Sequence, residues 1–541
     1  MKKLIPAYVL AFAISFMFYI YEPLTMYGNN VNDFWFDLYI MLKPILIAFF
    51  GLFLILSLIF TGIYFLNKKF SEKLTVYKIC LIITFISFIC FYIQGNYLTA
   101  GLPSLDGTNI DWKSYVNQEI ISYAVIGVVS IVTIICCIKF KMDNVINVSK
   151  FISLAVVVML TTSIVSMCLS VNLIRKKNGI LATTVNYNVA SSNKNFLILL
   201  VDAVDSVKFD EVMSKDKDFK NTFKDFTYYK DTMSVYGYTR DSLPLILSGK
   251  INDNTDDFAT YSTKALDNSL LFEELKNREY DRNIFDAELI WDSDKSNEMS
   301  NLVKSDRGVN DLAFIKNQTK YVLFKYLPFN LKKYSKIEHM YFNNSKSKGK
   351  NDYFTWGDIT NYDAITTNPI ETIEQNYFHF LHLEGAHVPF GLAKDLSYSP
   401  KNGYKSKIAG TLTVINAYLE RLKKYDVYDN SVIIVMADHG YSKGNGPLAR
   451  QNPILFIKGI DEHHDMIRSD IPVSHLDLND AYMDLLEGKK STELFSEIPK
   501  KRERIYMYYE YMKENHMVEY ITTGKAWEQN KLKKTGKEFN R

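Results

Sequence analysis

Long uncharged runs in the first third of the chain constrain its fold more than any other feature. Five runs are long enough to cross about 30 Å of hydrocarbon, which takes roughly 20 helical residues. They lie near residues 4–21, 44–66, 79–97, 120–138 and 151–171. Most charged residues come after residue 175. We therefore expect a domain of five transmembrane helices over residues 1–177, followed by a polar part with a different architecture.

The distribution of basic residues predicts how these helices are oriented. Lysines follow the second and fourth runs and precede the first, at Lys2, Lys3, Lys68, Lys69, Lys73, Lys139, Lys141 and Lys150. The loops near 22–37 and 98–119 carry acidic residues and one lysine. The positive-inside rule then places the N-terminus in the cytoplasm and, after five crossings, the polar part outside the cell. A cleavable signal peptide is a poor account of the first run, because four more runs follow.

Composition narrows the classes of partner and chemistry. The chain has 541 residues with 63 Lys and Arg against 60 Asp and Glu, a formal charge of +3. These charges are interspersed, so we expect no nucleic-acid partner. All five cysteines lie in the apolar first third, at Cys80, Cys90, Cys136, Cys137 and Cys168. Chemistry in the polar part must therefore use oxygen and imidazole groups.

After residue 178 short apolar runs alternate with amphipathic stretches. Three runs are typical of buried parallel strands, and each ends in polar residues: 196–203, 377–385 and 431–440. Helical spacing lies between them, at 269–278 and 407–425. This alternation predicts an α/β domain with a mostly parallel central sheet, and such sheets bind ligands beyond the carboxyl ends of their strands.

Three acidic or imidazole side chains follow these strands. Asp202 ends the first run, and Asp438 with His439 ends the third. Neighbouring residues of a regular strand face opposite sides, so joint use of Asp438 and His439 requires that the strand has already ended. Two carboxylates and an imidazole suit Zn²⁺, Mn²⁺ or Mg²⁺. The alternative is structural: Asp202 caps a helix and Asp438 begins a turn.

A hydroxyl near a helix N-terminus completes the candidate set. In YGYTRDSLPLILSGK (236–250), Thr239 and Ser242 precede an apolar, helix-like stretch. Backbone N–H groups at a helix N-terminus favour anions, so a hydroxyl there is placed for phosphoryl transfer. Either residue could instead be a simple N-cap, and Ser242, just before Leu243 and Pro244, is the better placed of the two for that role.

The ordered motifs resemble a known family. Strand-DA, T-x-x-S-x-P, H-L-E-G-A-H-x-P-F, A-D-H-G and V-S-H-L-D-L are similar to the sulfatase-like branch of the alkaline phosphatase superfamily. With five preceding spans, the layout resembles lipoteichoic acid synthases and lipid A phosphoethanolamine transferases. The resemblance implies a sulfatase-like catalytic domain (195–490). The polar stretch before it predicts a linker (178–194), and strand-like runs after it predict a C-terminal hairpin and tail that complete the domain (491–541). Residues 342–355 are expected to form a surface loop.

The resemblance also implies roles for individual residues. It makes Asp202, Thr239, Asp438 and His439 the shell of one divalent metal ion, Mn²⁺ or Zn²⁺ with Mg²⁺ possible, and Thr239 the nucleophile. The first ligand in lipoteichoic acid synthases is usually Glu, so Asp202 departs from that pattern in length. Sulfatases have a modified Cys or Ser in C/S-x-P-x-R, and this chain has Thr239, Asp241 and Leu243 at those positions. Formylglycine chemistry is therefore not expected.

Histidines beyond the metal shell match family positions that contact the transferred group or the leaving oxygen. These are His387 and His475, which the resemblance makes catalytic. Taken alone, each would be read as a surface or packing histidine, and the motif context favours the site. His382 and Glu384 alternate with the positions that face the site and are expected to be structural, and Arg450 is expected to be solvated.

These observations predict a metal-dependent, membrane-bound transferase. It would move a phospholipid head group, phosphoglycerol or phosphoethanolamine, onto a cell-envelope glycan, polymer or lipid through a phospho-threonine intermediate. The donor would be a membrane phospholipid. Two alternatives stay open: a hydrolase of phosphate or sulfate esters with the same fold, and a non-catalytic membrane regulator.

Overall fold

The computed structural model describes most of the chain, and each statement below concerns these residues. They are 2–31, 34, 36–99, 102, 110, 112–170, 180–216, 219, 221–304, 309–335, 352–441, 450–509 and 516–540. The chain divides into two units. Unit 1 contains Met1–Lys177 and Asp306–Lys348, and unit 2 contains Asn178–Ser305 and Gly349–Arg541.

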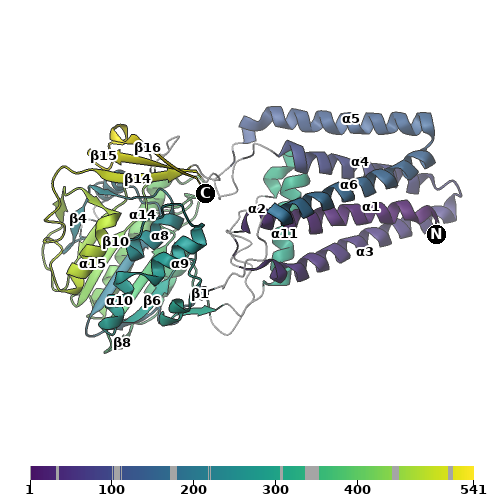
Figure 1. Ribbon diagram of the computed structural model, residues 1–541. Coiled ribbons are helices and arrows are strands. Elements are labelled where there is room, and N and C mark those ends of the chain that lie inside the picture. Colours follow the sequence, from purple (N-terminus) through teal and green to yellow (C-terminus); the bar gives the residue numbers. More distant parts are fainter. Residues whose placement is uncertain are drawn as a thin grey trace. The chain divides into compact units, whose positions relative to one another are not determined.

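Unit 1 holds the five apolar helices that the sequence predicts (Figure 1). By length and composition each can cross a membrane: Lys2–Asn29, Leu38–Phe70, Thr75–Leu98, Trp112–Phe140 and Met142–Ser170. They comprise η1 (Lys2–Leu4), α1 (Ile5–Phe16), η2 (Met17–Tyr21), α2 (Glu22–Asn29), α3 (Leu38–Phe70), α4 (Thr75–Ile93), η4 (Gln94–Leu98), η5 (Trp112–Tyr115), α5 (Val116–Phe140) and α6 (Met142–Ser170).

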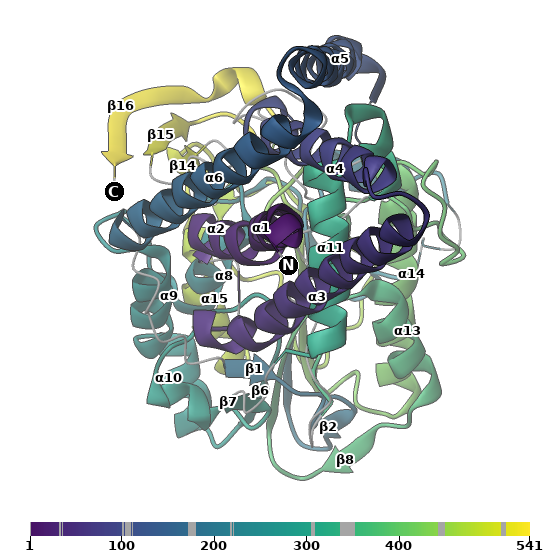
Figure 2. The same ribbon diagram turned by 90° about the vertical axis from the view of Figure 1, so that its right-hand side faces the viewer.

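A sixth long helix of unit 1 comes from within the predicted catalytic domain. Helix α11 (Asp311–Tyr326), followed by η8 (Phe329–Tyr334), runs across the spans rather than along them (Figures 1 and 2). Lys325 Nζ lies 2.7 Å from Glu22 Oε1, and the Tyr326 hydroxyl donates to Glu22 Oε2 over 2.6 Å. Unit 1 therefore includes residues 306–348, which lie within the expected catalytic domain of 195–490, and the sequence of α11 does not show which unit it packs on.

Unit 2 is built on a seven-stranded sheet in the order β12-β4-β11-β10-β3-β9-β6. All strands are parallel except β11, which is antiparallel to both of its neighbours. The strands are β3 (Asn195–Val201), β4 (Thr227–Tyr229), β6 (Asp281–Phe285), β9 (Tyr377–Leu383), β10 (Ser431–Met436), β11 (Leu455–Lys458) and β12 (Ile467–Ser469). The three predicted strands, β10, β3 and β9, are adjacent in this sheet, and the prediction of a mostly parallel sheet is confirmed.

Helices cover both faces of this sheet (Figure 2). Side chains of α8 (Thr239–Ser248), α10 (Leu270–Asn277) and α15 (Leu478–Leu486) form one apolar core with the strands. The opposite face has α13 (Asp358–Thr367) and α14 (Tyr404–Lys424), and α7 (Ser206–Met213) packs on α14. The remaining elements beside the sheet are α9 (Phe258–Asp267), η7 (Asp294–Glu298) and η10 (His475–Asp477).

Small sheets complete unit 2. The C-terminal hairpin forms as expected, and the tail adds a third strand: β14 (Arg504–Tyr509), β15 (His516–Thr522) and β16 (Lys533–Asn540), with η11 (Gln529–Lys531) before the last. Met507 N donates to Val235 O over 2.6 Å, which joins this sheet to the segment before α8. The other pairs are β1 (Ile180–Ala182) with β7 (Leu302–Lys304), β2 (Val189–Ser191) with β8 (Glu371–Ile373), and β5 (Thr232–Met233) with β13 (Val473–Ser474).

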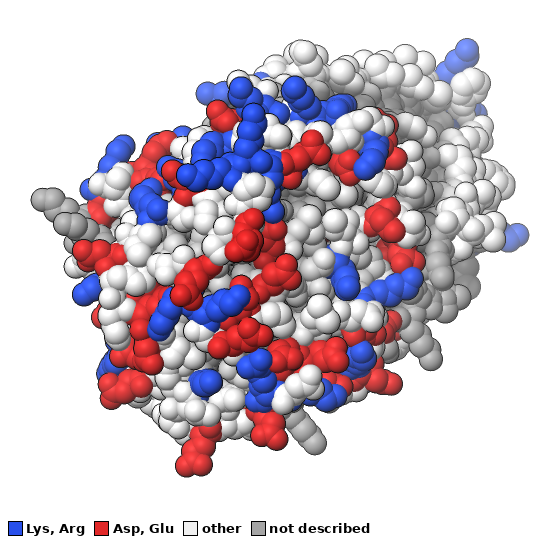
Figure 3. Space-filling view, turned by 60° about the vertical axis from the view of Figure 1, so that its left-hand side comes forward, with Lys and Arg blue, Asp and Glu red and all other residues white. Residues whose placement is uncertain are grey.

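Two sequence expectations concern the joints of this unit. The expected linker at 178–194 contributes strands β1 and β2, so much of it is part of the folded unit. Of the expected loop at 342–355, residues 342–351 lie outside the described residues. Charged side chains of both signs are interspersed over the face in Figure 3, with a group of Lys and Arg near its upper edge.

Candidate active site

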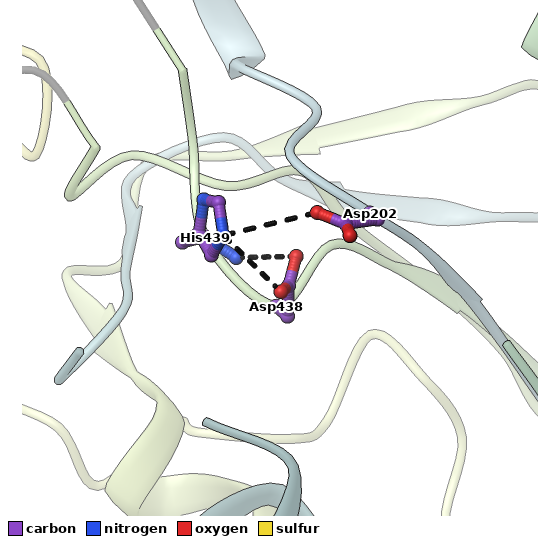
Figure 4. Close-up of side chains that lie close together, drawn as sticks. All are labelled: Asp202, Asp438 and His439. Atoms are coloured by element: carbon purple, nitrogen blue, oxygen red, sulfur yellow. Dashed lines mark hydrogen bonds and ion pairs between the residues drawn. The ribbon is translucent and has the colours of Figure 1, made fainter. Parts of the chain in front are cut away.

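The candidate metal ligands meet at the carboxyl ends of two adjacent parallel strands. Asp202 directly follows β3, and Asp438 and His439 follow β10 after Ala437. All three side chains are buried, and one ligand atom from each lies within 4.8 Å of the others (Figure 4). The expectation that the strand ends before Asp438 and His439 is confirmed.

Backbone contacts position the Asp438 carboxylate and the main chain at Asp202. Asp438 Oδ1 accepts hydrogen bonds from Ala203 N over 3.0 Å and from His439 N over 2.9 Å. Ala203 has φ of 57°, a conformation that costs free energy for a residue with a side chain and occurs often at functional sites. Gly385 follows β9 with φ of 59°, and a Cβ there would lie 2.5 Å from Asp202 N. Only glycine fits this close approach.

The remaining polar atoms of the cluster are arranged as ligands. His439 Nδ1 lies 2.8 Å from Gly440 O, so Nδ1 carries the donated proton and Nε2 keeps its lone pair. Nε2 lies 3.3 Å from Asp438 Oδ2 and 3.8 Å from Asp202 Oδ1. Neither of these two carboxylate oxygens has a hydrogen-bond partner among the described residues. Buried, unpaired oxygens are rare in folded proteins unless they hold an ion or a ligand.

The pKa shifts of the three clustered side chains are also consistent with a site for a cation. Burial, and then the nearby Asp438 carboxylate, raise the pKa of Asp202 well above its usual range. Burial opposes ionisation of Asp438, but the His439 imidazole holds the pKa of Asp438 below its ordinary value. Burial lowers the pKa of His439, and the Asp438 charge acts in the opposite direction. Two crowded carboxylates and a neutral imidazole are the donor set that a divalent cation binds.

Thr239 lies beside this cluster at the start of a helix. It is the first residue of α8, and its Oγ1 donates to Asp202 Oδ2 over 3.4 Å. The preceding residue, Tyr238, provides no side-chain cap. The expectation that Ser242 is the N-cap is wrong: α8 begins three residues earlier, and the buried Ser242 hydroxyl donates to Tyr236 O over 3.5 Å. Pro244 therefore lies inside the helix rather than at its first position.

His387 lies on the loop after β9. Its Nδ1 is 2.6 Å from Val388 O, and its half-buried ring lies 5.4 Å from the ring of Trp356. Burial, with the Lys407 charge as the next cause, lowers the pKa of His387 to about 3. Lys407 pairs with Glu384 and donates to Pro389 O over 3.1 Å, which anchors this loop.

His475 lies at the start of η10, behind β13. Its ring is fully buried, and neither ring nitrogen has a hydrogen-bond partner among the described residues. Burial lowers the pKa of His475 to about 3, and the charges of Asp438 and His439 act on it as well. Its role in catalysis stays a prediction, as does that of His387.

Two side chains that the sequence analysis placed outside the site also act on this region. Arg450 Cζ lies 4.7 Å from the ring centre of Tyr238, and its Nη1 donates to Gly237 O over 3.2 Å, so it is not merely solvated. His382, expected to be structural, is fully buried and pairs with Asp286, which directly follows β6. A carboxylate at a strand end was the only available signal, because 96 residues separate the two partners.

Comparisons with known proteins agree with this geometry. The sulfatase family model matches residues 194–487, which is more than half of the chain. The chain belongs to the sulfatase family. A search of curated proteins returned no match. The fold is that of an enzyme superfamily that generally uses a divalent metal, and the Asp202, Asp438 and His439 cluster is the candidate site for it.

Solved structures with a similar fold come from several bacteria. The putative sulfatase yidJ from Bacteroides fragilis is 11% identical, with a TM-score of 0.38, over 62% of this chain and 84% of that one. The C-terminal periplasmic domain of EcEptC from Escherichia coli is 10% identical, with a TM-score of 0.31, over 61% and 92%. A protein of the alkaline phosphatase superfamily from Vibrio parahaemolyticus is 10% identical, with a TM-score of 0.36, over 67% and 84%.

Proposed function

We propose that this protein is a metal-dependent, membrane-bound transferase that moves a phospholipid head group onto an envelope glycan, polymer or lipid. The observation that carries the proposal is the Thr239 hydroxyl, which begins α8 and donates to a buried carboxylate of the candidate metal cluster. A hydroxyl in this setting is an activated nucleophile. The five apolar helices of the same chain would keep it beside a lipid donor.

The mechanism follows from the residues present. Asp202, Thr239, Asp438 and His439 would hold a divalent cation, which lowers the pKa of a bound hydroxyl and offsets phosphoryl charge. Thr239 attacks the phosphorus of the head group, the bond to diacylglycerol breaks, and a phospho-threonine diester remains. The acceptor hydroxyl then attacks the same phosphorus and releases Thr239. Backbone N–H groups at the start of α8 favour the anionic group.

Two features support a transferase over sulfate-ester hydrolysis. Thr239 stands where sulfatases carry a modified Cys or Ser, and the unit 2 sequence has no cysteine from which formylglycine could form. A hydrolase of the same fold shares the first half-reaction and differs only in using water as acceptor. The family match keeps this as the second candidate.

Mass spectrometry of the Thr239 peptide tests the proposal. Full-length protein in detergent is incubated with Mn²⁺ or Zn²⁺ and a mixture of phospholipids, then quenched in acid. We expect an added mass on Thr239 equal to phosphoglycerol or phosphoethanolamine. Release of free head group without any acceptor alcohol would favour the hydrolase, and a metal-loaded protein with no adduct and no release would favour the regulator.

Orientation is part of the proposal, since the donor and acceptor are expected at the outer face. Protease added to intact spheroplasts should cleave within residues 342–355. Protection in intact spheroplasts, with cleavage only after lysis, would contradict the proposed orientation and the proposed access to outer-leaflet phospholipid.

A further inference from the structure

A buried histidine–carboxylate pair lies at the same edge of the sheet as the candidate metal cluster. His382 Nδ1 is 2.5 Å from Asp286 Oδ2, and both side chains are at most 1% exposed. The other oxygen of Asp286 accepts hydrogen bonds from the backbone N–H groups of Glu288 and Leu289. These backbone N–H groups therefore hold the Asp286 carboxylate in position, and the carboxylate in turn holds the orientation of the His382 ring.

The opposite nitrogen of this ring is free. His382 Nε2 is buried and has no hydrogen-bond partner among the residues that the structure describes. Because Nδ1 is committed to Asp286, any proton that the ring exchanges must pass through Nε2. A buried nitrogen without a partner is costly unless a ligand completes it.

The register of the sheet places this ring on the face of Asp202. His382 pairs with Leu200 of β3 in the parallel ladder, and Asp202 N continues the ladder by donating to Leu383 O over 3.2 Å. Residues two apart in a strand share a face, so Asp202 and His382 lie on the same side of the sheet. The charges of Asp202 and His382 act on each other accordingly.

Three other histidines of unit 2, His379, His387 and His475, lack a comparable carboxylate partner among the described residues. His387 contacts a backbone carbonyl through Nδ1, and neither nitrogen of His475 has a partner among the described residues. His379, three residues before His382 on β9, is also buried, but its Nδ1 lies 3.5 Å from a Tyr377 hydroxyl rather than near a carboxylate.

We propose that His382, held by Asp286, is the catalytic residue that gives a proton to the leaving oxygen and takes one from the incoming hydroxyl. This inference rests on the proposed transfer through Thr239. In the first half-reaction the Thr239 Oγ–P bond forms, the P–O bond to the leaving alcohol breaks, and Nε2–H protonates the leaving oxygen. The proton of the Thr239 hydroxyl passes to solvent.

The second half-reaction restores the ring. The acceptor oxygen bonds to phosphorus, the Thr239 Oγ–P bond breaks, and the acceptor proton passes to Nε2. Thr239 regains its proton from solvent. The resting protonation state agrees with this order: burial opposes the charged ring, but the carboxylates of Asp286, Asp202 and Glu288 outweigh it and raise the pKa of His382 to about 9.

Leaving-group dependence separates this role from a structural one. A p-nitrophenyl phosphodiester releases a stable anion and needs no proton, whereas an alkyl phosphodiester does need one. With metal-loaded, full-length protein, His382→Gln should lower the rate of Thr239 adduct formation more than about a hundredfold on the alkyl ester and less than about tenfold on the nitrophenyl ester. Asp286 is a positioning residue, so Asp286→Asn should also lower the rate more on the alkyl ester than on the nitrophenyl ester, but by a smaller factor.

His379→Gln is the matched control, because it changes an equally buried histidine on the same strand. It should lower both rates alike, if at all. Equal losses on both esters for His382→Gln and Asp286→Asn would overturn the inference and make the pair structural. If His382→Gln fails to fold, the test rests on Asp286→Asn alone, through the ratio of its rate loss on the alkyl ester to its rate loss on the nitrophenyl ester. Absence of any adduct in the wild type would instead contradict the proposed function.

Discussion

The two units differ in where their apolar side chains lie: many are exposed on the helices of unit 1, and those of the central strands of unit 2 are buried. In the spans of unit 1, Phe50 and Leu58 of α3 are 60% and 62% exposed, although the helix is strongly apolar. In unit 2 every residue of β3, β9 and β10 is buried. An apolar surface of this extent is stable in hydrocarbon and not in water. Burial therefore identifies the core of unit 2, whereas exposure identifies the membrane surface of unit 1.

The two units also differ in whether their buried carboxylates have hydrogen-bond partners. In unit 1 the Glu22 carboxylate receives Lys325 on one oxygen and Tyr326 on the other, so its partners are complete. In unit 2, Asp202 and Asp438 each keep one oxygen without a hydrogen-bond partner among the described residues. A satisfied buried charge supports the fold, and an unsatisfied one marks a place for a ligand.

The largest effect should follow from removing the proposed nucleophile. Thr239→Ala should lower head-group release from labelled phospholipid by more than about a hundredfold, because the hydroxyl forms the bond that changes. Its stability should change by only about 0.5 to 1.5 kcal/mol, the usual contribution of one hydrogen bond. A variant that keeps more than about a hundredth of the rate, a barrier change under ~3 kcal/mol, would contradict the covalent mechanism.

Ser242→Ala is the control for this prediction. Ser242 is buried one turn into α8 and does not cap the helix, so the loss of about 1 kcal/mol expected for a missing cap does not apply. Its activity should stay within about tenfold of wild type, since its hydroxyl donates to Tyr236 O rather than to the cluster.

Removal of one ligand charge should weaken metal binding. Asp438→Asn keeps an oxygen for the N–H groups of Ala203 and His439 but loses the negative charge, so affinity for Mn²⁺ or Zn²⁺ should fall by more than about tenfold. Metal titration followed by elemental analysis measures this. The same content of tightly bound metal in wild type and variant would place the ion elsewhere.

The buried charge of unit 1 should matter for stability. Glu22→Ala leaves Lys325 without its carboxylate and the Tyr326 hydroxyl without its acceptor, and should cost on the order of 2 to 3 kcal/mol. Lys78→Ala, which removes an ion pair with the exposed Asp143, should cost under about 1 kcal/mol. Unfolding in detergent measures both, and equal losses would mean that α11 is not anchored through Glu22.

The smallest effect should be a pH dependence in unit 2. Burial, with the Glu384 charge as the next cause, raises the pKa of Asp358 to about 7. The folded state therefore prefers the protonated carboxyl, and this stability is lost as pH rises from about 4 through 7. Asp358→Asn stays neutral, so it should gain on the order of 2 kcal/mol over wild type between pH 5 and pH 8. Denaturation curves at both pH values test this, and a parallel offset would contradict it.

Much of this architecture is predictable from the sequence because it depends on local patterns. Hydropathy alone indicates the five spans, and short apolar runs indicate β3, β9 and β10. The cluster of Asp202, Asp438 and His439 follows from parallel strands, whose carboxyl ends share one edge. These features need no knowledge of which distant segments meet.

The parts that sequence patterns missed depend on such distant contacts. The sequence of α11 does not show that it packs on Glu22, about 300 residues away. The His382–Asp286 pair joins two strand ends across the sheet, and β16 pairs with β15 without an apolar run of its own. The start of α8 at Thr239 rather than after Ser242 reflects tertiary packing that places Pro244 inside the helix.

A pulse–chase measurement on Thr239 tests the central claim most directly. Full-length, metal-loaded protein is given phospholipid labelled with ³²P in the head group and ³H in the acyl chains, and acceptor alcohol is added after the pulse. We predict that Thr239 carries ³²P without ³H, and that the label passes to the acceptor at least as fast as steady-state turnover. Transfer to the acceptor without label on Thr239, or an adduct that does not decay when acceptor is added, would contradict the phospho-threonine mechanism.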